Sequence, residues 1–256
     1  MTPAARWARP RRWLGVLAWA VWALTMLGLA VAAWLDHLQR QAGSPETAWL
    51  LQPASIPLLV AAVSAATVGA LLGSRRPAHP VGWLLLGLGL LVVANGVVSG
   101  YVNYGLLTRP GALPGAGYLA GVANGIQVLW LACVSFVLLL TPTGSLPSPR
   151  WRWWAWVAAV VPLLALASSA LLPFEPPYQS IPNPLAVPSL AGPLRLVNGL
   201  TWAVTGLSVL VAAGSLVVRF RRARGLERQQ LRWLAYGAAL TGMAVLALVA
   251  LIPTGN

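Results

Sequence analysis

The stretch RRPAHPVGWLLLGLGLLVVANGVVSGY (Arg75–Tyr101) decides the fold of this chain. It begins with two arginines and continues, from Val81, as 21 residues without Asp, Glu, Lys, Arg or His. A helix needs about 20 apolar residues to cross a bilayer. The stretch therefore predicts one membrane span with a short basic gap in front of it.

The same alternation of gap and apolar run repeats along the chain. Seven runs are long enough to span: Trp13–Leu35, Ser55–Leu72, Val81–Tyr101, Tyr118–Leu140, Trp154–Leu172, Leu196–Val218 and Trp233–Leu251. Backbone groups in hydrocarbon must find their hydrogen bonds within the protein, which forces helices here. We expect an all-α, polytopic bundle in which residues 13–251 form a seven-helix membrane domain, between a basic stub (1–12) and a tail (252–256).

All 17 basic residues are arginines, and their positions predict the orientation. Fourteen fall in four alternate gaps: Arg6, Arg9, Arg11, Arg12, Arg75, Arg76, Arg150, Arg152, Arg219, Arg221, Arg222, Arg224, Arg228 and Arg232. The intervening gaps hold only Arg40, Arg109 and Arg195. Short loops rich in arginine stay on the cytoplasmic side. The N-terminus is therefore expected inside, and the tail after the seventh span outside.

The composition, at 58% hydrophobic and 8% charged residues, is that of a chain built for lipid. A soluble domain carries roughly 25% charged residues. The net charge of +13 does not indicate nucleic-acid binding, because the arginines are spread over short loops rather than one folded basic face. Their expected partner is the anionic inner leaflet. The absence of lysine, with abundant Ala, Gly, Leu, Pro and Val, indicates a GC-rich bacterium and its cytoplasmic membrane.

Small residues and a few amides are the candidates for helix packing, because close approach and polar bonds drive association in lipid. The candidate small residues are Gly117, Gly121, Gly125, Gly96 and Gly100, together with the pair Gly69 and Gly73. We expect tight crossings within one chain, with a homodimer as the alternative. The intramembrane amides are Asn95, Asn124, Gln127 and Asn198. Each is expected to bond across helices, and a transport path is the alternative.

The predicted spans lack the residues that carry catalysis or ion coupling. Ionisable side chains inside a membrane mark proton relays and ion paths, and none falls within a predicted span. The two histidines, His37 and His79, are expected in loops on opposite sides of the membrane. No Cys/His or carboxylate cluster has metal-ligand spacing, and no phosphate-binding loop is present. We expect no catalytic residue, no metal and no cofactor.

Two loops stand out by composition. Pro173–Pro193 holds seven prolines in 21 residues, which predicts an extended outside loop because proline resists helix. It is either a plain connector or a surface that senses a ligand, a lipid or the envelope. The second loop, Arg219–Arg232, is an anchor or a coupling element to a cytoplasmic partner. Its candidate residues are Arg219, Arg221, Arg222, Arg224, Glu227, Arg228 and Arg232.

Four stretches, taken in order, resemble the N-terminal membrane region of sensor histidine kinases from actinobacteria. They are RRPAHPVGWLLLGLGLL (Arg75–Leu91), TPTGSLPSPRWRWWAW (Thr141–Trp156), NPLAVPSLAG (Asn183–Gly192) and SLVVRFRRARGLERQQLRWLAYGAAL (Ser215–Leu240). Such kinases often carry arginine and glycine where this chain has Ser145 and Ala186. They also continue into a phosphoacceptor helix and an ATP-binding domain, which are missing from these 256 residues.

The resemblance implies a sensory or regulatory membrane module, similar to the input half of a two-component kinase and truncated before the catalytic domains. A cytoplasmic kinase or response regulator would be its partner. The alternatives are a small transporter or channel component, an uncharacterised structural membrane protein and, given a polar cluster in the membrane, an intramembrane enzyme.

Overall fold

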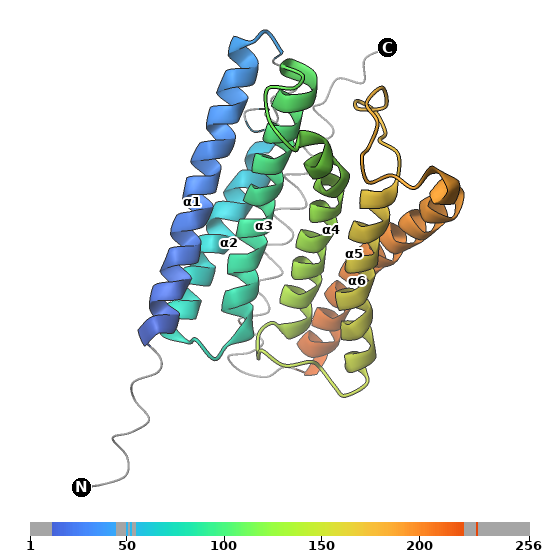
Figure 1. The fold of residues 1–256 in the computed structure, drawn as a ribbon. Coiled ribbons are helices and arrows are strands. Elements are labelled where there is room, and N and C mark those ends of the chain that lie inside the picture. Colours follow the sequence, from blue (N-terminus) through green and yellow to red (C-terminus); the bar gives the residue numbers. More distant parts are fainter. Residues whose placement is uncertain (1–11, 45–49, 51, 53–54, 223–228, 230–256) are drawn as a thin grey trace, which may run out of the picture.

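The computed structural model describes residues 12–44, 50, 52, 55–222 and 229, which form helices joined by loops and contain no strand. Six long helices occur in this part (Figure 1): α1 (Arg12–Gln41), α2 (Ile56–Arg75), α3 (Pro80–Asn103), α4 (Ala116–Leu140), α5 (Trp151–Leu171) and α6 (Ala191–Arg222). A π turn, η4 (Tyr104–Thr108), prolongs α3, and a 3-10 turn, η5 (Pro188–Leu190), precedes α6. Most of the predicted stub, the seventh span and the tail lie outside the described residues.

The outward faces of these helices are suited to lipid. All six helices are long and apolar enough to cross a membrane. Trp153, Leu196 and Val16 expose 70% or more of their surface, whereas soluble monomers rarely expose apolar patches larger than a few hundred Å². A membrane protein with a multi-span helical bundle is thus confirmed for the described residues. The seventh span, the orientation and the bacterial cytoplasmic membrane stay predictions.

The described arginines sort to the two ends of the bundle. The start of α1, the α2–α3 loop, the α4–α5 loop and the end of α6 lie at one end in Figure 1. We call this the arginine-rich end, because Arg75, Arg76, Arg150, Arg152 and Arg221 lie there. Arg40, Arg109 and Arg195 belong to the opposite end. The fold therefore gathers the arginines as the positive-inside rule requires.

Several helices run further than the apolar runs predict. The prediction that His37 lies in a loop was wrong, because α1 continues to Gln41. Asp36 is 3% exposed, and the buried Gln39 donates from Nε2 to the Gly100 carbonyl of α3 over 3.3 Å. A helix continues as long as its backbone bonds and its packing hold, so a charged residue does not end it. The Pro-rich loop is shorter than predicted for the same reason, since α6 already begins at Ala191.

Helices α2 and α3 meet along a seam of small residues. A Cβ on Gly69 would lie 2.6 Å from the Leu86 backbone nitrogen, and one on Gly89 would lie 2.7 Å from the Ala62 carbonyl oxygen. Neither position can therefore hold a larger residue without separating the helices. In lipid, such backbone contact is a main source of helix association.

The glycine ridge of α4 also faces its own chain. A Cβ on Gly125 would lie 2.2 Å from Leu166 Cδ1 and 2.8 Å from Leu166 Cα on α5. Gly121 faces the Ala170 carbonyl of α5, Gly117 faces Pro184 and Gly100 faces Leu35 of α1. Gly96 is buried on α3. These contacts lie within one chain, and the homodimer stays an untested alternative.

Helix α6 packs through a stripe of small and polar residues spaced four and three apart. The stripe is buried and consists of Thr201, Thr205, Ser208, Ala212, Ser215 and Arg219. Spacing of this kind keeps a set of side chains on one face of a helix. The opposite face is exposed, with Leu200 at 66% and Leu210 at 69%. The stripe therefore places α6 against α4 and α5 and turns its leucines toward lipid.

Candidate functional site

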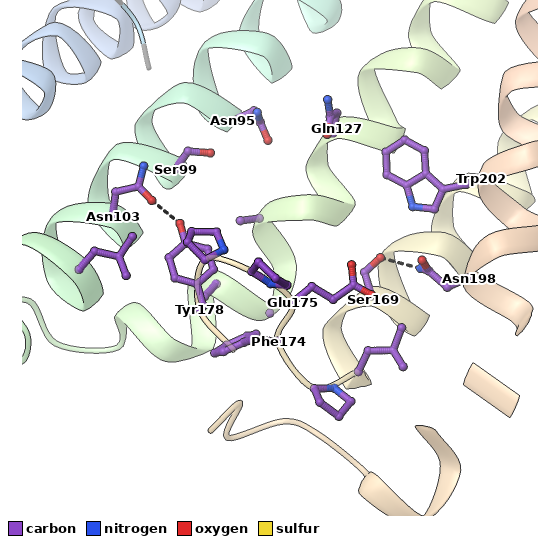
Figure 2. A pocket seen from close by; sticks show the side chains of 18 of the residues that line it. Asn95, Ser99, Asn103, Gln127, Ser169, Phe174, Glu175, Tyr178, Asn198 and Trp202 are labelled. Atoms are coloured by element: carbon purple, nitrogen blue, oxygen red, sulfur yellow. Dashed lines mark hydrogen bonds between the residues drawn. The ribbon is translucent and has the colours of Figure 1, made fainter. Parts of the chain in front are cut away.

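A cavity of about 770 Å³ opens between α3, α4 and the chain segments at the junction of α5 and α6. It lies in the half of the bundle opposite the arginine-rich end, and Figure 2 shows it from close by. The polar side chains among its described lining residues are Gln52, Asn95, Ser99, Asn103, Gln127, Ser169, Glu175, Tyr178 and Asn198. Its size falls in the range of about 300–1,000 Å³ typical of small-molecule sites.

Helix α3 presents a polar stripe to this cavity. Asn95, Ser99 and Asn103 are four residues apart, so they share one helix face. The outermost, Asn103, accepts a hydrogen bond on Oδ1 from the Tyr178 hydroxyl. Figure 2 shows Asn95 and Ser99 on the same side of the helix as Asn103. Three polar residues on one face of a span are costly in lipid, and the cavity removes that cost.

Gln127 brings an amide to the cavity from α4. It lies 11 residues after Ala116, where α4 begins, which places it about 16 Å along the helix. The cavity thus reaches from the end of the bundle to near the middle of the span. Neither Gln127 nor Asn95 has a side-chain hydrogen bond to another described residue. The expectation that these two amides bond across helices stays a prediction, because the seventh predicted span lies outside the described residues. Both amides line the cavity.

Asn198 of α6 does bond across helices. Its Nδ2 donates to Ser169 Oγ at 2.7 Å, Ser168 Oγ at 3.0 Å and the Ala165 carbonyl at 3.2 Å, all on α5. Figure 2 shows the bond to Ser169 at the wall of the cavity. Asn198 therefore fixes the start of α6 against the end of α5. The fourth predicted amide, Asn124, lies on α4, but its side chain is outside the described residues.

The Pro-rich loop folds back on α5 and lines the cavity with residues 172–178. Asn183 holds it, because Nδ2 donates to the carbonyls of Ala170 at 3.0 Å and Leu172 at 2.7 Å. Its Oδ1 accepts from the Leu185 backbone nitrogen at 2.9 Å. These bonds fix the loop against α5 as one wall of the cavity, whereas its prolines predicted an extended segment.

Two aromatic rings sit on this wall. Phe174 and Tyr178 pack edge to face with centroids 6.1 Å apart. Burial raises the pKa of the Tyr178 phenol, so this group stays a neutral donor to Asn103 at physiological pH. The loop is thereby tied to α3 as well as to α5.

A second cluster lies at the arginine-rich end, where the side chain of Arg219, near the end of α6, binds the α4–α5 loop. Its guanidinium donates to the Leu139 carbonyl at 2.7 Å, to Thr143 Oγ1 at 2.9 Å and to the Ser145 carbonyl. Arg219 is only 8% exposed. The side chain thus bridges α6 to the end of α4 and the α4–α5 loop, whereas the sequence placed Arg219 at the start of the loop Arg219–Arg232.

His79, at the start of α3, contacts the same α4–α5 loop. Its Nε2 donates to the Pro142 carbonyl at 3.2 Å. Gly144, with φ of +76°, lets the loop turn tightly there, and a Cβ at this position would lie 3.2 Å from His79 Nε2. His37 is in α1 at the other end, so the predicted separation of the two histidines is confirmed. Residues 79, 141–145 and 219 form what we call the inner cluster.

The rest of the predicted coupling loop is less informative. Arg221 is exposed and Arg222 ends α6. Arg224, Glu227, Arg228 and Arg232 lie outside the described residues. A signal for Arg219 was present in the sequence, because this arginine continues the four-and-three spacing that begins at Thr201.

The described residues contain no group of three or more His, Cys, Asp or Glu side chains that could hold a metal ion. No known protein family, curated protein or solved structure matched this chain when compared with it. The function must therefore be inferred from the cavity and the inner cluster themselves.

Proposed function

We propose that this protein is an integral membrane sensory module. A molecule that enters the cavity from outside the cell shifts the bundle between two arrangements, and the inner cluster passes that shift to a cytoplasmic partner. A ligand can shift such an equilibrium only through different affinities for the two states. The amides of the cavity, several of which have no partner in the described part of the chain, are suited to provide that difference.

The observation that carries this proposal is the position of α6. This helix contributes Asn198 to the cavity wall and Arg219 to the inner cluster. A change in the cavity that moves α6 against α5 therefore also moves Arg219 against the α4–α5 loop. Coupling of this kind requires one structural element that both sites bias, and α6 is such an element.

The inner cluster also supports the hypothesis, drawn from the sequence, that the chain resembles the membrane region of a sensor kinase. His79 belongs to the stretch Arg75–Leu91, Pro142 to Thr141–Trp156 and Arg219 to Ser215–Leu240. These are three of the four stretches that resemble sensor-kinase membrane regions, and their residues meet through hydrogen bonds. The partner we propose is a cytoplasmic histidine kinase core or its response regulator. An in-frame or adjacent kinase gene would support this partner, and an operon of transport genes alone would argue against it.

The coupling can be tested before a ligand is known. Replacing Cys133, the only cysteine, leaves a background for spin labels at the exposed Arg150 and Arg221. Ala123→Trp fills the cavity from α4, because Ala123 lines it. We expect this variant to shift the label-to-label distance distribution measured by pulsed electron resonance.

The matched control is Ala203→Trp, which adds the same ring to an exposed position of α6. It should leave the distances between the labels unchanged. Equal distributions for wild type and for Ala123→Trp, with both proteins folded, would show that the cavity and the inner cluster are independent and would refute the sensory proposal.

A transporter is the second candidate, and the depth of the cavity favours it. Asn95 and Gln127 bring polar groups to the middle of their spans, as a translocation path requires. Time-dependent solute uptake into proteoliposomes that contain only this protein would support transport over sensing. Binding without uptake would support sensing.

A further inference from the structure

The cavity carries a charge opposite to that of the chain. Glu175 is the one acidic or basic residue among its described lining residues, although the net charge of the whole sequence is +13. Figure 2 shows the Glu175 side chain directed from the loop toward Ser169 and Asn198. A ligand with a carboxylate or phosphate would meet this negative charge without any arginine or histidine of the described lining to offset it.

We propose that the cavity binds a small organic cation, a molecule with one protonated or quaternary amine and a hydrogen-bonding group. This inference rests on the proposed function, because it names the ligand of the same site. The Glu175 carboxylate supplies the counter-charge at the loop.

Aromatic rings around the cavity fit the same ligand. Phe174 and Tyr178 line it from the loop, Trp130 from α4 and Trp202 from α6. The face of an aromatic ring attracts a cation within about 6 Å, and quaternary ammonium groups are commonly recognised in this way. Trp202 lies on the same side of the cavity as Asn198 in Figure 2. A ligand that contacts Trp202 would therefore contact α6 directly.

The amides specify the rest of the ligand. Asn95, Ser99 and Gln127 have no side-chain hydrogen bond to other described residues, and each can both donate and accept. A hydroxyl or carbonyl group of the ligand would satisfy them. The ammonium end would then lie near Glu175 and the polar end deeper in the cavity, near α3 and α4.

The test compares choline with 3,3-dimethylbutan-1-ol, its uncharged analogue of the same shape, on the full chain in lipid nanodiscs. Ethanolamine and ammonium complete the set of cations. Titration calorimetry should show binding of choline or ethanolamine, and affinity for the uncharged analogue at least about tenfold weaker. Equal affinity for choline and its uncharged analogue would overturn the inference in favour of a neutral polar ligand.

Glu175→Gln keeps the shape of the side chain and removes its charge. We expect the affinity for the bound cation to fall by about tenfold, with unchanged thermal unfolding of the unliganded protein because Glu175 is exposed. The control is Gln179→Ala, because Gln179 lies on the same loop but does not line this cavity. Unchanged affinity in Glu175→Gln, or no binding of any cation up to about 10 mM, would refute the cation site.

The two proposals fail in different ways. If no cation binds but Ala123→Trp still shifts the distance between labels at residues 150 and 221, the ligand class is wrong and the coupling stands. If choline binds through Glu175 and neither choline nor Ala123→Trp shifts that distance, the cation site stands and the sensory role is wrong.

Discussion

Arg219→Met tests the bridge between α6 and the α4–α5 loop. The substitution keeps the apolar stem and removes the guanidinium, and with it the hydrogen bonds to Leu139, Thr143 and Ser145. Leu139 is fully buried, so its carbonyl oxygen would lose a donor that water cannot replace, at a cost of about 1–3 kcal/mol. Thr143 and Ser145 are exposed, and water can take over their bonds at little cost.

Hydrogen exchange at the Gly144 amide is the sharpest measurement, because this amide donates to the Leu140 carbonyl inside the loop over 2.7 Å. Each 1.4 kcal/mol lost from local stability raises exchange about tenfold, so we expect an increase of about 10- to 100-fold. Arg221→Met is the matched control, since Arg221 is exposed. If both variants leave the exchange of Gly144 at the wild-type rate, the bridge does not hold the loop and the reasoning fails.

Two further predictions concern packing and orientation. Gly125→Ala should destabilise the protein by about 1–3 kcal/mol through overpacking against α5. Gly199→Ala, with nothing within 4 Å of the added carbon, should instead stabilise α6 by about 0.5–1 kcal/mol. Unfolding followed by tryptophan fluorescence compares the two variants, and equal effects would contradict the close contact at Gly125. Alkaline phosphatase fused after Pro188 should be active outside the cell and inactive when fused after Arg222, and the reverse pattern would overturn the predicted orientation.

The arginine pattern predicted the arrangement of the described bundle because it follows from a global constraint. Hydrocarbon excludes charge from every span, so the charged residues indicate where each loop lies along the sequence and at which end of the bundle it belongs. The same rule carries no information about the contacts of Arg219. A long side chain can bury its stem and guanidinium against a loop while its backbone stays at the helix end. Charge alone therefore located the residue on the correct end of the bundle and missed its contacts.

The amides show a second limit of sequence reasoning. Asn95 and Asn198 are the same residue type in equally apolar runs, yet Asn198 has three acceptors on α5 and Asn95 faces the cavity. Which outcome applies depends on the neighbouring helix, and helix periodicity carries little information when the lipid-facing and buried sides are both apolar. The cavity could therefore be seen only after α3, α4 and α6 had been placed together.

The stripe of α6 has a mechanical consequence. Thr201, Thr205, Ser208 and Ser215 donate their hydroxyl hydrogens to carbonyls of their own helix. The hydrogen bonds of Asn198 to α5 and of Arg219 to the α4–α5 loop lie 21 residues or about 31 Å apart on α6. Helix α6 is thus tied to its neighbours by polar bonds near both ends, and its middle packs against them through small buried side chains. Because a continuous helix is stiff, a rigid-body displacement of α6 at Asn198 would be carried to Arg219 at the other end of the bundle.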